Sequence, residues 1–128
     1  MKRAVGIAVS AVVLVGCSAA PVQPSARCEA VSADRAALIL GSSGGVSVVK
    51  AGAVKSLDHS NAYYIAIKFT GPGLEKDPPV GVWASAGGIE SGMVVSVDSM
   101  AEEFSGILKD SRFPSSDKGA DEARTCVS

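Results

Sequence analysis

The side chains that could do acid–base or nucleophilic chemistry gather around a single histidine. His59 is the only histidine in 128 residues, and Asp58 and Ser60 flank it. A serine, a histidine and an aspartate act as a nucleophilic triad only where the three side chains converge in space, and neighbours in sequence usually point apart. Asp, Ser and Asn are also turn-forming residue types. The sequence therefore predicts a turn histidine here rather than a catalytic one.

The other candidates for chemistry have simpler interpretations. Glu102 and Glu103 fall in the first turn of an expected helix, where the helix dipole favours acidic residues. The glycine runs over 41–45 and 87–88 precede expected strands, whereas phosphate-binding loops lead into a helix N-terminus. The sequence has no Cys-x-x-Cys spacing to accompany its one histidine, as a zinc site would need. We expect no catalytic residue, no cofactor and no metal.

The N-terminus has the layout of an export signal. Lys2 and Arg3 precede an uncharged stretch over 4–15, which ends in Leu14-Val15-Gly16-Cys17. That stretch is too short for a membrane-spanning helix, which needs ~20 apolar residues, and it fits a signal peptide. Leu, a small residue, Gly and Cys in this position resemble the lipobox of bacterial lipoproteins.

The lipobox resemblance implies a lipid anchor. The thiol of Cys17 would take a diacylglyceryl group, signal peptidase would cut before Cys17, and the new amine would often be acylated (palmitate) as well. The alternatives are an uncleaved N-terminal helix and an ordinary secretory signal cleaved near 18–20. We expect a signal peptide over 1–16, a lipidated tether over 17–27, and one domain over 28–128. The protein would then be held at the extracytoplasmic face of the cell membrane.

The remaining two cysteines bracket the domain. If Cys17 carries lipid, Cys28 and Cys126 are left as a pair in a compartment that permits disulfides. Two free thiols are the alternative. We predict the Cys28–Cys126 disulfide, which would close a loop of nearly 100 residues and stabilise the fold by about 4.7 kcal/mol in the chain-entropy model.

Composition excludes one class of partner. Without Lys2 and Arg3, the 12 basic residues fall to ten against 13 acidic residues, so the mature chain has a net charge near −3. Nucleic-acid binding requires a clustered basic face. We expect no nucleic-acid partner.

Hydrophobic patterning predicts an α+β domain: a short helix, a four-stranded antiparallel meander, and a C-terminal helix packed on one face of the sheet. The expected elements are a helix over 33–40, strands over 46–56, 62–70, 80–85 and 93–97, and a helix over 99–109. Gly52 is expected to mark a bulge in the first strand. The first helix should begin after Ser32 and bury Ala33, Ala36, Ala37 and Leu40. Ser99 and Glu102 have the spacing of a capping box for the last helix. The tail from Asp110 reads as polar, held near the domain only by the disulfide.

The segment over 62–105 also resembles small uncharacterised exported proteins of actinobacteria. The shared features are Tyr63-Tyr64, Gly71-Pro72-Gly73, Val82-Trp83-Ala84 and Val97-Asp98-Ser99-Met100-Ala101-Glu102-Glu103-Phe104-Ser105. The resemblance covers about a third of the chain and implies no particular activity.

Period-two alternation suggests a contact surface. It places Tyr63, Ile65, Ile67 and Phe69 inside. It places Trp83 on one face of its strand and Val82 and Ala84 on the other face. If Val82 and Ala84 face the core, Trp83 faces out, with Tyr64 on the same outer face. Exposed aromatic residues among small ones can form a protein or ligand contact. The alternatives are a sheet covered on both faces, or a Trp83 that faces the core.

Three functions are consistent with these features. The first is a non-enzymatic, lipid-anchored envelope lipoprotein that binds a protein or cell-wall ligand. The second is a phage- or prophage-encoded lipoprotein that mediates superinfection exclusion at the membrane. The third is an enzyme of unrecognised type.

Overall fold

The computed structural model describes residues 27–41 and 45–128. The signal peptide predicted over 1–16, the predicted lipidation site Cys17 and most of the predicted tether therefore lie outside the described residues. None of the helices in the described part is long and apolar enough to cross a bilayer.

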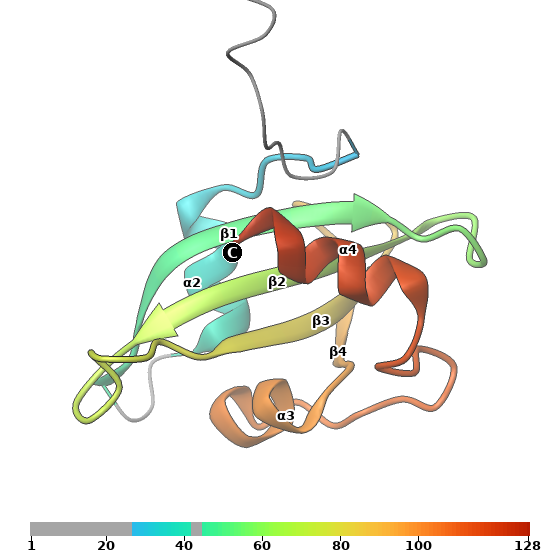
Figure 1. Cartoon of the computed structure of the whole chain (residues 1–128). Helices are drawn as coiled ribbons and strands as arrows, with labels where there is room; N and C mark the ends of the chain where they lie inside the picture. Colours follow the sequence, from blue (N-terminus) through green and yellow to red (C-terminus); the bar gives the residue numbers. More distant parts are fainter. Residues whose placement is uncertain (1–26, 42–44) are drawn as a thin grey trace, which may run out of the picture.

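Four antiparallel strands form one sheet, in which each strand pairs with the next along the chain. The strands are β1 (Ser47–Lys55), β2 (Ala62–Thr70), β3 (Val80–Ala86) and β4 (Met93–Ser96). The predicted α+β meander is confirmed. β1 and β4 form the two edges of the sheet, and β2 and β3 lie in its centre (Figure 1).

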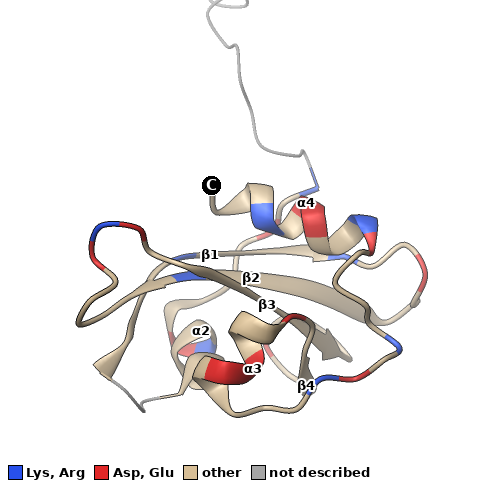
Figure 2. Ribbon diagram, turned by 60° about the horizontal axis from the view of Figure 1, so that its bottom comes forward, with Lys and Arg blue, Asp and Glu red and all other residues tan. Residues whose placement is uncertain are grey.

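Helices cover both faces of this sheet. The helices α2 (Ala33–Leu40) and α3 (Ser99–Ser105) lie on one face, and α4 (Lys118–Cys126) lies on the other (Figure 2). The α2 helix begins as predicted, because the Ser32 hydroxyl accepts a hydrogen bond from the Arg35 N–H at 3.1 Å. It buries Ala36, Ile39 and Leu40.

The α3 helix is shorter than predicted and starts differently. Its N-cap is Asp98, whose carboxylate accepts the Ala101 N–H at 2.9 Å, so the Ser99–Glu102 capping box is wrong. The helix ends at Gly106, whose φ of 77° places it in the left-handed region that glycine adopts readily. The segment predicted to continue the helix to 109 is irregular, and Lys109 forms a single bridge to Ser96 of β4.

The polar tail contains a helix that sequence reasoning missed. α4 lies across β1 and β2 and places Ala120, Ala123 and Cys126 against the sheet. These small side chains let the helix approach the strands closely. The face of β2 predicted to be wetter is therefore covered by α4 at Tyr64 and Ala66.

The two faces of the sheet carry two separate cores. The core under α4 contains Val54, Ala62, Tyr64, Ala66, Val82, Ala84, Val97, Phe113, Ala120, Ala123, Cys126 and Val127. The core under α2 and α3 contains Ala36, Ile39, Leu40, Ala53, Ile65, Ile67, Phe69, Trp83 and Ala101. The domain is thus three layers thick, and its central strands have no solvent face over most of their length.

The irregularity of β1 is not at Gly52. The register shift lies between Val48 and Lys50. At Gly52, an added Cβ would lie 2.8 Å from the Cβ of Cys126. Glycine is needed there for the close approach of α4, not for a bulge.

Candidate functional site

The predicted aromatic contact surface does not exist. Trp83 is 0% exposed and Tyr64 is 1% exposed. They also lie on opposite faces of the sheet, because Trp83 pairs with Ile65 and Tyr64 pairs with Ala84. The alternation within each strand was predicted correctly, but the face of β3 was wrong: the register puts Trp83, rather than Val82 and Ala84, on the face of Ile65. Tyr64 lies on the other face, where α4 covers it.

Trp83 is held in place by its surroundings under α3. Its indole Nε1 donates a hydrogen bond to the Ser105 hydroxyl at 3.0 Å. An added Cβ at Gly81 would lie 2.8 Å from the indole Cη2, so the glycine leaves room for the ring. The indole therefore serves as a core residue with its polar atom satisfied.

Tyr64 fastens the start of α4 to the sheet. Its hydroxyl donates a hydrogen bond to the Asp117 carboxylate, and its ring meets Phe113 edge-on with centroids 6.1 Å apart. Burial, followed by the Asp117 hydrogen bond and charge and then the Asp58 charge, raises the pKa of the Tyr64 phenol above its usual value. The phenol thus stays protonated and acts as a structural donor.

His59 lies in the predicted turn between β1 and β2. Its Nε2 lies 2.9 Å from the Arg112 carbonyl oxygen, and its ring centroid is 4.5 Å from that of Phe113. The ring's hydrogen bond goes to Arg112 rather than to Asp58 or Ser60, so no triad forms. The contact packs the β1–β2 hairpin against the segment that leads into α4.

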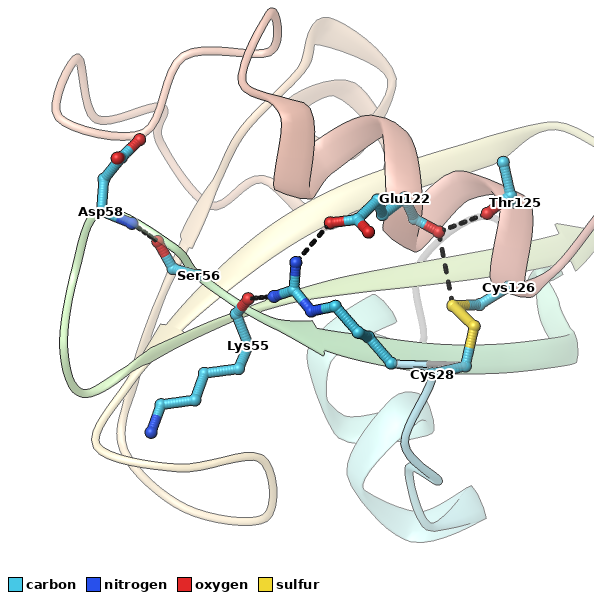
Figure 3. A network of polar contacts seen from close by, with 8 residues as sticks. Cys28, Lys55, Ser56, Asp58, Glu122, Thr125 and Cys126 are labelled. Atoms are coloured by element: carbon cyan, nitrogen blue, oxygen red, sulfur yellow. Dashed lines mark hydrogen bonds and ion pairs between the residues drawn. A yellow bond between two sulfur atoms is a disulfide. The ribbon is translucent and has the colours of Figure 1, made fainter. Parts of the chain in front are cut away.

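The disulfide joins the start of the domain to the last turn of α4. Cys28 and Cys126 are bonded, with their Cα atoms 5.8 Å apart, which confirms the predicted pair (Figure 3). Arg27, the first described residue, forms a 2.6 Å ion pair with Glu122 of α4 and donates a hydrogen bond to the Lys55 carbonyl at the end of β1. The chain therefore enters the domain beside α4 and is fixed there at three points.

The loop over 87–92 is tied to α2. Arg35 Nε donates to the Ile89 carbonyl at 2.9 Å, and Arg35 Nη2 donates to the Ser85 hydroxyl at 3.1 Å. The Glu90 carboxylate accepts the Ser32 N–H at 2.8 Å and the Ser32 hydroxyl at 2.5 Å. These two hydrogen bonds from Ser32 hold the pKa of Glu90 below its usual value. Arg35 and Glu90 therefore hold the loop over 87–92 against α2.

The best candidate for a binding site is a groove between α2 and the first half of β1. It is open, has a volume of about 720 Å³, and is mostly apolar. Its lining residues are Ala33, Asp34, Ala37, Leu38, Leu40, Gly41, Val46, Ser47 and Val48. Leu38 is 75% exposed, so the groove presents a large apolar side chain to solvent.

Sequence reasoning did not find this groove. Ala33 and Ala37 were predicted to face the core, but both are exposed and line the groove. The available signal was Leu38, an apolar residue beside the buried stripe of Ala36, Ile39 and Leu40. One exposed leucine carries little information alone, and only the position of β1 turns it into part of a site.

Within the described ranges, no three residues among His, Cys, Asp and Glu are grouped so that they could hold a metal ion. The chain has no significant match among protein-family models, curated proteins or solved structures.

Proposed function

We propose that this chain is a lipid-anchored lipoprotein of the cell envelope, which holds a protein or cell-wall ligand at the extracytoplasmic face of the membrane and catalyses no reaction. The observation that carries the proposal is Leu14-Val15-Gly16-Cys17, placed after Lys2, Arg3 and an uncharged stretch. Two acyl chains give stable anchoring, because each buried CH₂ contributes about 0.8 kcal/mol.

The disulfide supports export. Disulfides persist in oxidising compartments outside the cytoplasm, and Cys28 is bonded to Cys126. With three cysteines in the chain, this pairing leaves Cys17 as the one available for acylation.

The point where the chain enters the domain supports a short anchor. Arg27 is fixed to Glu122 and to the end of β1. An extended chain advances at most ~3.6 Å per residue, so the ten residues from Cys17 to Arg27 span at most roughly 36 Å. The domain would stay within about one domain diameter of the bilayer, with its groove accessible to neighbours in the envelope.

Lipidation is tested by comparing the wild-type protein with Cys17→Ala. The wild-type protein should fractionate with membranes, and its intact mass should equal that of residues 17–128 plus the acyl groups. Cys17→Ala should lack the added mass and keep its signal peptide or leave the membrane. Cys28→Ala is the matched control, because it should keep the acyl mass. A wild-type mature protein without added acyl mass would refute the proposal.

The binding role is tested in intact envelopes. Chemical crosslinking of the anchored wild-type protein should recover a protein or cell-wall fragment that is lost with Leu38→Glu, a change at the groove. Leu108→Glu, at another highly exposed leucine, is the matched control. Turnover of a substrate in a broad hydrolase panel would argue for an enzyme instead.

A further inference from the structure

The described part of the chain covers the outer edge of β1 only in part. The Glu29 N–H donates to the Ala53 carbonyl at 2.7 Å, and the Ala53 N–H donates to the Glu29 carbonyl at 2.9 Å. In an antiparallel sheet, alternate residues direct both backbone groups to the same side. The backbone groups of Ala51 therefore also point to the outer edge. Among the described residues, Glu29 is the only one bridged to this edge.

Glu29 shows that this edge accepts an added strand. The chain pairs with β1 at one residue and then leaves it to form α2. From Ala51 back to Ser47, no described residue bridges to the edge, which runs beside the groove. An extended peptide that continued the pairing would satisfy the free backbone groups, as in β-strand addition to a sheet edge.

One side of such a strand would meet apolar surface. Val48 and Ala51 pair with Phe69 and Ile67, so they lie on the α2 face of the sheet. The shift between Val48 and Lys50 keeps Val48 on that face. Alternate side chains of an added strand would point to the same face and reach Leu38 in the groove.

The other side would meet Lys50 of β1, with Lys68 of β2 one strand further in. Lys50 lies directly opposite Lys68 in the β1–β2 pairing. Like charges at such positions destabilise a sheet. All 13 Asp and Glu residues fall within the described ranges, and none of those carboxylates forms an ion pair with Lys50 or Lys68. An acidic side chain opposite Lys50 on an added strand would supply the missing charge.

A second copy of this chain is a poorer occupant. Pairing two β1 edges about a two-fold axis would bring Lys50 of each copy toward the other, next to the existing Lys50–Lys68 pair. The lysines thus act against self-association at this edge, as charged residues commonly do on edge strands.

We infer that the β1 edge and its groove bind an extended peptide segment of a partner protein, in which apolar and acidic side chains alternate, as a fifth strand of the sheet. The inference rests on the proposed function and names the partner's chemistry.

The test uses the whole mature protein in non-ionic detergent and a labelled nine-residue peptide that alternates valine with glutamate. Fluorescence anisotropy should show binding of this peptide and at least about tenfold weaker binding of the same peptide with lysine in place of glutamate. Lys50→Glu should weaken binding of the glutamate peptide by about three- to tenfold and strengthen binding of the lysine peptide. Lys109→Glu, a change next to β4 at the opposite edge of the sheet, should leave both affinities within about twofold.

Amide hydrogen exchange distinguishes strand addition from simple charge attraction, because charge attraction alone would not protect backbone N–H groups. Binding of the glutamate peptide should slow exchange at the Ala51 N–H, because an added strand would accept its hydrogen bond. Protection confined to other strands would overturn the inference, as would equal binding of the two peptides by the wild-type protein. Equal weakening by Lys50→Glu and Lys109→Glu would also overturn it.

The oligomeric state tests whether a second copy of the chain, rather than a partner peptide, occupies the β1 edge. Sedimentation of the peptide-free protein should show a monomer, and a dimer abolished by Ala51→Pro would assign the edge to a second copy and refute the inference. These outcomes are distinct from failure of the proposed function. Missing acyl mass at Cys17 would refute anchoring, whereas a failed peptide titration with acylated protein would refute only the edge site.

Discussion

Ile65 and Trp83 lie directly opposite each other on β2 and β3, and both side chains are fully buried. Their shared face is covered by α2 and α3. On the reverse face, Tyr64 and Ala84 are opposed in the same way beneath α4. The centre of this small sheet is therefore core on both sides, which leaves binding to its edges and its outer helices.

The first prediction concerns Trp83. Trp83→Ala should lower the free energy of unfolding by about 3–5 kcal/mol, because it removes a fully buried indole and leaves a cavity. Leu38→Ala should change it by less than about 0.5 kcal/mol, because Leu38 is mostly exposed. Denaturant melts of the two variants measure both values. Equal small losses would show that Trp83 is not core.

The second prediction concerns the disulfide. Reduction, or Cys126→Ser, should cost about 2–5 kcal/mol, because the bond between residues 98 positions apart restricts the unfolded chain. Non-reducing peptide mapping should recover the Cys28 and Cys126 peptides joined. Melts with and without reductant give the energy. Recovery of both residues as free thiols from exported protein would contradict the pairing.

The third prediction is a loss of stability on replacing a helical glycine with alanine, although helix propensity alone predicts a gain. In an exposed helix, replacing glycine with alanine stabilises by up to about 1 kcal/mol. At Gly119 of α4, an added Cβ would lie 2.7 Å from the Tyr64 Cδ2 atom. Gly119→Ala should therefore destabilise the domain, by about 1–3 kcal/mol. A thermal or denaturant melt decides the sign, and a more stable variant would show that α4 does not pack on Tyr64 as described.

The fourth prediction concerns acid. The Ser32 hydrogen bonds lower the pKa of Glu90 in the folded state. A carboxylate with a lowered folded pKa stabilises the fold above its unfolded pKa, and that contribution is lost as the pH falls through the folded pKa. The loop over 87–92 should therefore loosen from α2 only as Glu90 becomes protonated, at a pH below the ordinary Glu pKa of 4.5.

NMR titration of the Glu90 carboxyl group checks this directly. Ser32→Ala should raise the pKa of Glu90 toward its ordinary value, and Ser99→Ala, at an exposed serine on α3, should leave it unchanged. An unaltered Glu90 pKa in Ser32→Ala would contradict the assigned cause.

The sequence by itself determined the four strands, the first helix and the disulfide. Alternation from Ala62 to Thr70 predicted β2 with its correct bounds, and Ser32 predicted the start of α2. These signals are local, since period two and capping act over a few residues. Cysteine arithmetic predicted the Cys28–Cys126 bond, which joins the two ends of the domain.

Only the tertiary structure decided what is buried and where a partner could bind. α4 has few large apolar side chains, so its amphipathic signal rests on Ala120, Ala123 and Cys126, which are too small to stand out in the sequence. Its docking buries Tyr64, and the docking of α3 buries Trp83. The groove and the Lys50–Lys68 pair unite residues from different elements, because strand register and helix packing, rather than distance along the chain, set which side chains are neighbours.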